Sequence, residues 1–276
     1  GGGDSGALYV FTRSGTTWTQ QAKLTPNDAG PNDRLGQDVA IDGDTIVAGA
    51  HLDHSVADDS GSAYIFVRNG TTWTQEAKLV ASDGGPTDQF GYSVTIDGDT
   101  VAIAANQVSV VGYPDVGAIY MFRRTGTSWT EEAKLMASER DPFDRMGNDI
   151  DLSGDTVVVG VREGLSPHAY VFTYDGSTWN EEAKLVASNN GGNFGRDVAI
   201  QNNHIVVSSS TADGNGSSSG AVYVFERTNA GWTETAIISG NDSVNGDGFG
   251  TSVDLNNTTI AVGAQVTNSN GALYIF

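Results

Sequence analysis

The densest group of ligand-binding side chains lies in one short segment, residues 51–59. It reads His-Leu-Asp-His-Ser-Val-Ala-Asp-Asp and supplies two imidazoles and three carboxylates. Such groups coordinate Zn²⁺ and other divalent ions, and they hydrogen-bond polar ligands. We interpret the segment as a candidate ligand-binding loop, while a merely solvated loop is the alternative. The candidate residues are His51, Asp53, His54, Asp58 and Asp59.

A second set of carboxylates keeps a fixed distance from a recurring hydrophobic-Gly pair. Four aspartates stand three residues before that glycine, and two of them have another aspartate five residues earlier. Their oxygens could bind Ca²⁺, or they could accept backbone N–H groups in Asx turns. Repetition fits a structural turn well, so both interpretations stay open. The residues are Asp33, Asp88, Asp144 and Asp247, with Asp28 and Asp83 upstream.

The segment 243–248, Ser-Val-Asn-Gly-Asp-Gly, has the composition of a degenerate calcium loop. Asn245 and Asp247 would be its oxygen donors. It lacks the first aspartate and the late glutamate that such loops use. We therefore keep Ca²⁺ as a possible cofactor and name no other.

All these residues belong to a sequence that repeats five times. Each repeat has a Trp, then an Ala-Lys-Leu-like strand, a hydrophobic-Gly pair, an alternating apolar run and a Tyr-x-Phe strand. A period of roughly 50 residues with several strands per unit predicts a β-propeller, because one unit cannot bury its apolar faces alone. The tryptophans are Trp18, Trp73, Trp129, Trp179 and Trp232.

Each repeat predicts four antiparallel strands, which we call A, B, C and D. In one repeat these are residues 91–96, 100–104, 118–123 and 129–135. The A–B and C–D connections are short turns, whereas the B–C and D–A loops are longer and more variable. Long loops on a rigid scaffold are the usual place of function, so we expect the B–C/D–A face to bind ligand. Two other B–C loops add Asp115 and Asp213 as candidate ligand-binding residues.

The strand count gives five copies of A, B and D but six of C. We expect residues 1–276 to form a single all-β propeller domain, part of a longer chain, with five four-stranded blades. The first D strand would complete a blade with the last A, B and C strands. A segment of a larger ring is the alternative. The extra C strand also suggests self-association by strand exchange.

Composition excludes several kinds of partner. The formal net charge of −20 argues against nucleic acid, and no apolar run is long enough to insert into a membrane. There are no cysteines, so no disulfide or thiolate metal site exists. One repeat position carries lysine in four copies, which is typical of an exposed edge strand. We therefore predict that strand D is the outermost strand of each blade. The lysines are Lys23, Lys78, Lys134 and Lys184.

The recurring motifs of the five repeats together resemble FG-GAP repeats, which form the blades of the integrin α-subunit propeller and of many secreted proteins. The resemblance rests on Phe90-Gly91, Phe194-Gly195 and Phe249-Gly250, on Ala48-Gly49-Ala50, and on the Gly-x-x-Tyr-x-Phe strand. It implies an extracellular or cell-surface propeller used for adhesion or recognition. The A–B loop that often binds calcium in integrin-type blades is only a two-residue turn here. The resemblance therefore gives no reason to assign calcium to the aspartates beside that turn.

No catalytic constellation stands out. The sequence Gly-Ser-Ser-Ser-Gly at 216–220 fits Gly-x-Ser-x-Gly, but a nucleophile elbow needs a strand–turn–helix, and none is predicted here. We expect a non-catalytic module that binds a protein or glycan ligand. A structural subunit built by propeller–propeller contacts is the second hypothesis, and a propeller enzyme is a remote third.

Overall fold

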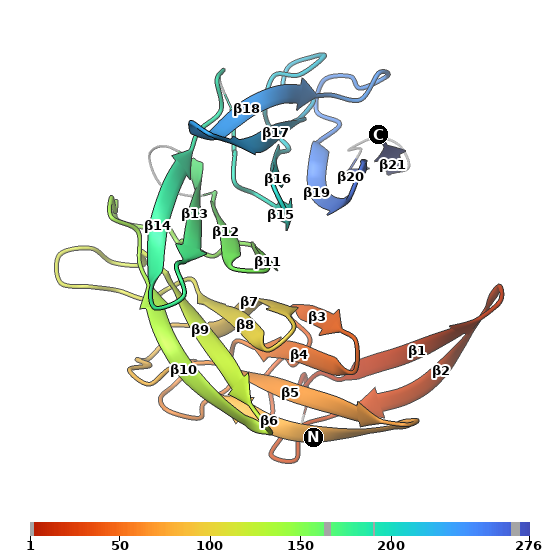
Figure 1. Cartoon of the computed structure of the whole chain (residues 1–276), viewed down its shortest axis with the longest axis vertical. Coiled ribbons are helices and arrows are strands. Elements are labelled where there is room, and N and C mark those ends of the chain that lie inside the picture. Colours follow the sequence, from red (N-terminus) through yellow and green to blue (C-terminus); the bar gives the residue numbers. More distant parts are fainter. Residues whose placement is uncertain (1–2, 163–166, 190, 266–270) are drawn as a thin grey trace. The chain divides into compact units, whose positions relative to one another are not determined.

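The computed structural model describes residues 3–162, 167–189, 191–265 and 271–276. It divides into two compact units, residues 1–109 with 117–134 and residues 110–116 with 135–276 (Figure 1). Both units are built from antiparallel sheets of the same design. Within the described residues, no helix is long and apolar enough to cross a membrane.

The first unit contains a hairpin and two four-stranded sheets. The hairpin pairs β1 (Leu8–Ser14) with β2 (Thr17–Leu24). The first blade is β3 (Val39–Asp42), β4 (Thr45–Ala50), β5 (Ser62–Asn69) and β6 (Thr72–Leu79). The second blade is β7 (Phe90–Asp97), β8 (Thr100–Ala105), β9 (Ala118–Thr125) and β10 (Ser128–Leu135).

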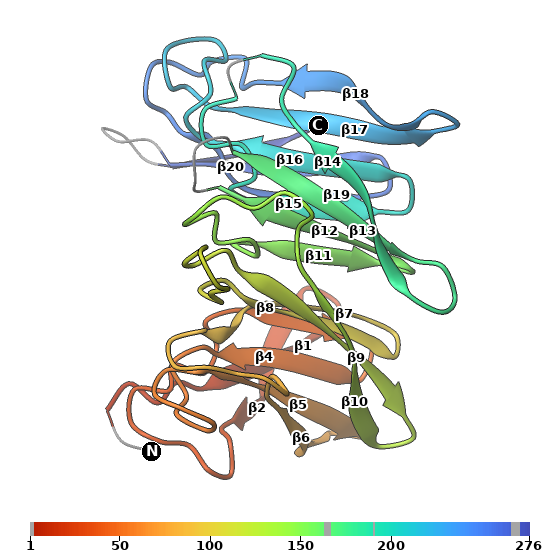
Figure 2. The same cartoon turned by 90° about the vertical axis from the view of Figure 1, so that its left-hand side faces the viewer.

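The second unit contains two four-stranded sheets and one of three strands (Figure 2). The third blade is β11 (Ile150–Ser153), β12 (Thr156–Val161), β13 (His168–Tyr174) and β14 (Trp179–Leu185). The fourth is β15 (Val198–Gln201), β16 (His204–Ser209), β17 (Ala221–Thr228) and β18 (Gly231–Ile238). The three-stranded sheet is β19 (Phe249–Asn256), β20 (Thr259–Ala264) and β21 (Ala272–Ile275).

The predicted fold class, an all-β propeller of four-stranded antiparallel blades, is confirmed. Strands follow one another across each four-stranded sheet in chain order, from A at one edge to D at the other. The lysine-bearing strand D is therefore an edge strand, as predicted. The first copies of strands C and D form a hairpin, in which β2 pairs with β1 from Leu8↔Leu24 to Ser14↔Thr17.

Within the first unit, the Phe-Gly pair at 90–91 joins the second blade to the first. Phe90 donates its backbone N–H to Ser60 of the first blade at 2.9 Å, and its ring is fully buried against Tyr120 of its own blade. Gly91 has φ of +90°, and a Cβ there would lie 2.3 Å from the Ser62 carbonyl oxygen. Only glycine allows both this conformation and this approach. The glycines of the other four pairs also have positive φ.

A bulge in strand D explains the recurring Gln/Glu-Ala-Lys sequence. The C–D register shifts between Ile65 and Phe66, so that Glu76 has no partner across the ladder. A bulge turns its extra side chain out of the regular alternation. Glu76 uses this freedom to accept a hydrogen bond from the Trp129 indole of the next blade at 3.0 Å. Trp73 with Gln21 and Trp232 with Glu182 make the equivalent contact, so a Trp–Gln/Glu hydrogen bond links successive copies of strand D within each unit.

We predict that Gly91→Ala destabilises the protein by about 3 kcal/mol or more. The added Cβ meets backbone atoms, and a left-handed conformation disfavours any residue with a Cβ. Gly98→Ala is the matched control, because Gly98 also has positive φ (+57°) but has open space around it. It should lose only about 1 kcal/mol. Thermal and urea unfolding of both variants would measure this difference, and equal losses would contradict it.

Candidate functional site

A polar pocket of about 380 Å³ opens beside the first blade, in the first unit. The B–C loop of this blade and the D–A loop that precedes it form most of its wall. A lysine from β6 completes it. The pocket therefore lies on the loop face that the sequence predicts as the binding surface. Its lining residues are Asp28, Gly30, Pro31, Asn32, Asp33, Asp53, His54, Ser55 and Lys78.

At the base of the pocket, one lysine joins the two loops. The Lys78 ammonium lies 2.6 Å from Asp28 and 3.0 Å from Asp53. The Tyr64 hydroxyl from β5 lies 3.0 Å from Asp28 and 2.9 Å from Asp53, so its single proton is shared in hydrogen bonds to both carboxylates. The ammonium also lies over the Tyr64 ring, 5.1 Å from its centroid. We call Tyr64, Lys78 and the D–A loop acid Asp28 the lysine clasp.

The clasp is a repeated structural element. In the second blade Lys134 contacts Asp83 at 2.7 Å and lies over Tyr120. In the third, Lys184 contacts Glu139 at 2.9 Å and lies over Tyr170. The fourth blade has lost both charges together: Tyr223 donates to Asn189, and the lysine position is Ile237. Acid and lysine are thus kept or replaced as a pair, which indicates that the clasp holds the D–A loop on the blade.

Asp53 is the feature that the second and fourth blades do not share. Its backbone N–H bonds to Ala50, and its carbonyl oxygen accepts from Gly61. Val108 in the second blade and Ala212 in the fourth make the same two backbone contacts, and both are buried apolar residues. The first blade therefore places a carboxylate, only 4 % exposed, where its neighbours place apolar side chains. Repetition of the blade does not require this residue.

Hydrogen bonds keep the buried carboxylate charged. Burial alone would raise the pKa of Asp53, but Ser55, Lys78 and Tyr64 together lower it below its usual range. Burial likewise opposes the charge on Lys78, yet contacts with Asp28, Tyr64 and Asp53 raise its pKa overall. Burial also raises the pKa of Tyr64, so its hydroxyl remains protonated. The pocket floor therefore holds a charged Asp53 carboxylate beside the charged Lys78 ammonium and the neutral Tyr64 phenol.

The rim of the pocket offers both donors and acceptors. Ser55 donates its hydroxyl to Asp53, which leaves the lone pairs of its oxygen open. His54 accepts the Asp59 backbone N–H at Nδ1, at 2.8 Å, so the proton of the neutral ring is on Nε2. Asp28 keeps about half of its side chain exposed. An incoming polar ligand meets a carboxylate, a hydroxyl and an imidazole within one pocket.

His51 does not line this pocket. It is buried, its ring meets Tyr92 edge-on at 5.8 Å, and its Nδ1 has no hydrogen-bond partner. Burial, assisted by the positive charge of Arg34, lowers the pKa of His51 to about 4. The imidazole is therefore neutral near pH 7. It belongs to the packing beneath the loop, while Asp53 and His54 belong to the pocket.

The four aspartates before the Phe-Gly pairs have a shared backbone role. Asp33 accepts the Gly30 N–H at 2.5 Å, and Asp88 accepts the Gly85 N–H at 2.7 Å. Asp144 and Asp247 make the same contact with the residue three positions earlier, both at 2.7 Å. Burial raises the pKa of Asp144 despite this bond. This geometry matches the turn interpretation.

The remaining candidate residues lie in separate places. Asp58 and Asp59 accept the Thr87 and Gln89 backbone N–H groups through their carbonyl oxygens. Asp115 pairs with Arg145 at 3.4 Å in the second unit. Asp213 accepts the Ser218 N–H at 2.9 Å, and Asn245 accepts the Ser217 N–H at 2.9 Å. The sequence-predicted residues that the structure brings together are Asp28, Asp33, Asp53 and His54.

Calcium would meet an obstacle at the first two D–A loops. An ion bound between Asp28 and Asp53 would have to displace the Lys78 ammonium, and at Asp83 it would have to displace Lys134. In the part of the chain that the structure describes, no group of three or more His, Asp or Glu side chains is arranged to hold a metal ion. These residues do not form the oxygen cage that Ca²⁺ prefers. Calcium binding remains a prediction.

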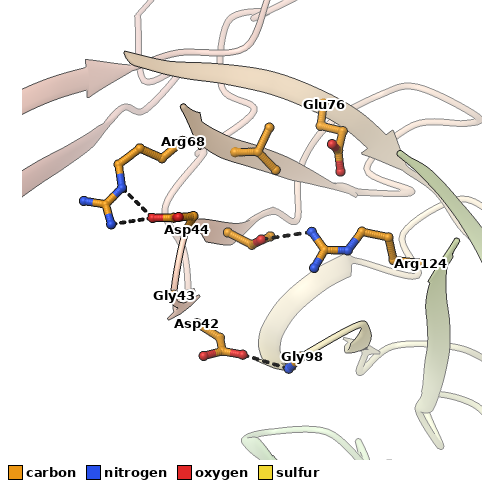
Figure 3. A pocket seen from close by; sticks show the side chains of 9 residues that line it. Asp42, Gly43, Asp44, Arg68, Glu76, Gly98 and Arg124 are labelled. Carbon is orange, nitrogen blue, oxygen red and sulfur yellow. Dashed lines mark hydrogen bonds and ion pairs between the residues drawn. The ribbon is translucent and has the colours of Figure 1, made fainter. Parts of the chain in front are cut away.

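A second pocket, of about 430 Å³, lies among the A–B and C–D turns of the first unit (Figure 3). Its charged side chains all have partners, and one pair of them forms an ion pair within the pocket. Arg68 donates to Asp44 at 2.6 Å, and Arg124 donates to Thr45 at 3.1 Å (Figure 3). Asp42 accepts the Gly98 N–H of the next blade at 2.8 Å. Asp44 thus holds an arginine and Asp42 holds the turn of the next blade, so the first pocket remains the better candidate site.

Sequence reasoning missed Lys78, Tyr64 and Ser55 as parts of the site. It interpreted the lysine as a mark of an exposed edge strand and the tyrosine as a core residue. The signal was nonetheless present once the repeats are grouped into blades, because the fourth blade has Ile237 at the lysine position and Asn189, in the D–A loop before it, in place of the acid. Paired replacement at two repeat positions indicates contact.

Comparison with known proteins agrees with this architecture. The family model described as FG-GAP repeat matches residues 18–66, 73–122, 129–172, 179–225 and 232–276. A crystal structure of a protein from Lactobacillus plantarum is similar in fold, with a TM-score of 0.55 at 15 % identity over 94 % of this chain and 74 % of that one. No curated protein matches the sequence.

We predict that Lys78→Gln and Lys134→Gln differ in stability. Loss of Lys78 leaves the buried Asp53 carboxylate without its counter-ion, which should lower the free energy of unfolding by about 3 kcal/mol. Lys134 forms its ion pair with Asp83, whose side chain is 55 % exposed. Loss of Lys134 should therefore lower the free energy of unfolding by about 1 kcal/mol or less. Thermal unfolding at pH 7 would compare them, and a larger loss for Lys134→Gln would contradict the assignment.

A second prediction concerns the stability of the protein at acidic pH. The pKa of His51 in the folded protein, about 4, lies below its ordinary value of 6.5, so folding favours the neutral ring. Its contribution is complete above pH 6.5 and falls as the pH drops toward 4. Relative to His51→Asn, the residue type of Asn106 in the second blade, the wild type should lose on the order of 1–2 kcal/mol more between pH 7 and 4.5. Parallel pH dependence in urea unfolding would refute this.

Proposed function

The chain belongs to the FG-GAP repeat family, and from this premise we propose that it is a non-catalytic recognition module of the cell exterior. It would bind a protein or glycan through the B–C/D–A loop face, with the pocket beside the first blade as the anchor. We propose an extracellular or cell-surface location and an adhesive role. The net charge of −20 supports a partner other than nucleic acid.

The observation that carries the proposal is the buried carboxylate of Asp53. A blade can be built with an apolar residue at this position, as Val108 and Ala212 illustrate. A buried charge carries a desolvation penalty that well-packed apolar side chains avoid. Unusual, costly polar groups in a pocket are typical of functional sites. Structure alone gives no reason for Asp53, whereas ligand binding does.

The scaffold beneath the pocket also supports recognition. Strands β4 and β5 on either side of the B–C loop are buried over most of their length. The lysine clasp holds the D–A loop onto β5 and β6 through three side chains. Binding groups fixed in this way lose little conformational entropy when a ligand arrives. Such preorganisation suits a binding site on a propeller.

The first test is saturable binding by wild type and Asp53→Val. We expect the purified chain to bind at least one member of an immobilised panel of extracellular matrix proteins and polysaccharides. Asp53→Val copies the second blade, so it should fold, yet bind at least tenfold more weakly, about 1.4 kcal/mol. Circular dichroism would confirm folding. Equal binding by both proteins would refute the pocket as the anchor, and no binding to any member would refute the proposal for these ligand classes.

A further inference from the structure

We propose that the pocket beside the first blade binds a neutral, hydroxyl-rich sugar, and that it does so without a metal ion. This inference rests on the proposed function, because it names the ligand class of the same pocket. It depends on three properties of the pocket: its charge, its pattern of donors and acceptors, and the position of the Lys78 ammonium between two carboxylates.

Charge favours a neutral ligand. An anionic ligand would approach Asp28, Asp33 and Asp53, and the single lysine cannot balance all three. A cationic ligand would be attracted by the excess of carboxylates, but it would have to compete with Lys78, which already lies 2.6 Å from Asp28 and 3.0 Å from Asp53. An anion is thus repelled, and a cation must displace an ammonium that the fold already holds in place. A neutral polar molecule meets neither obstacle.

The hydrogen-bonding groups fit hydroxyls in particular. A sugar hydroxyl donates one hydrogen bond and accepts others. The half-exposed carboxylate of Asp28 and the free lone pairs of Ser55 can accept from it, while the Nε2–H of neutral His54 can donate to it. Asn32 adds an amide that can do both, and the Pro31 ring offers an apolar surface for the C–H face of a sugar. A pocket of about 380 Å³ is within the range of small-ligand sites, roughly 300–1,000 Å³.

The lysine supplies the positive charge that a metal ion would otherwise provide. Two carboxylates facing one ligand would repel each other unless a cation lies between them. Here Lys78 takes that position and fixes both side chains, with Tyr64 sharing its proton between them. The acceptors are thus held in place by the fold itself. Sugar binding at this pocket should therefore be independent of Ca²⁺.

An array of immobilised oligosaccharides tests the proposal. It should carry neutral hexose and N-acetylhexosamine termini beside sulfated and uronic-acid sugars, with poly-lysine as a cationic probe. We expect wild type to bind at least one neutral sugar, with affinity unchanged within about twofold in millimolar EDTA. We expect His54→Ala and Asp53→Val each to weaken this binding at least tenfold. His54 is exposed, so its replacement should leave the fold intact. The matched control, Lys134→Gln, removes the equivalent lysine of the second blade and should bind like wild type.

The other outcomes separate the two proposals. Binding to poly-lysine or to a matrix protein that is lost in Asp53→Val, with no neutral sugar bound, would overturn the sugar assignment and leave the recognition pocket standing. A preference for sulfated or uronic-acid sugars would also overturn it, as would loss of binding in EDTA. Sugar binding that both substitutions leave intact would overturn both proposals for this pocket.

Discussion

The close backbone approach between neighbouring blades is the constraint on which the rest of the structure depends. Gly91 meets the Ser62 carbonyl so closely that no side chain fits, and Phe90 beside it fills the core of its own blade. Because the two residues are adjacent, one dipeptide sets both the spacing between blades and the packing within a blade. The B–C loop of the first blade ends at Ser62, so this blade contact also fixes one end of a loop that lines the candidate pocket.

Repetition separates structural residues from functional ones in this chain. Acids that recur at one position have recurring partners: Asp33 and Asp88 bond the backbone three residues earlier, and Asp28 and Asp83 hold lysines. Asp53 has no counterpart in the second or fourth blade, where Val108 and Ala212 take its place. In a repeat protein, equivalent positions of different blades can be compared with one another. A residue that the architecture needs appears in several blades, whereas a residue that appears in one blade needs another explanation.

The fold was largely predictable from sequence, because its determinants are local and repeated five times. Turn pairs, alternating strands and the Phe-Gly dipeptide each indicate the same four-stranded unit. The candidate site was predictable only in part. Asp53 and His54 stood out in their loop, and Asp28 in another, but Lys78 lies 50 residues from Asp28 in the chain. That contact exists because the D–A loop folds over the following blade, and no short-range pattern encodes it.

The lysine clasp also explains how so acidic a chain can place carboxylates close together. With 34 acidic and 14 basic side chains, most carboxylates cannot have a cation of their own. All four lysines of the chain stand at one repeated position, and in the first three blades the ammonium is held by an acid and a tyrosine ring. Beside the first blade the same ammonium serves a second carboxylate, Asp53. A structural element present in other blades thereby becomes the base of a pocket through the change of a single apolar residue to aspartate.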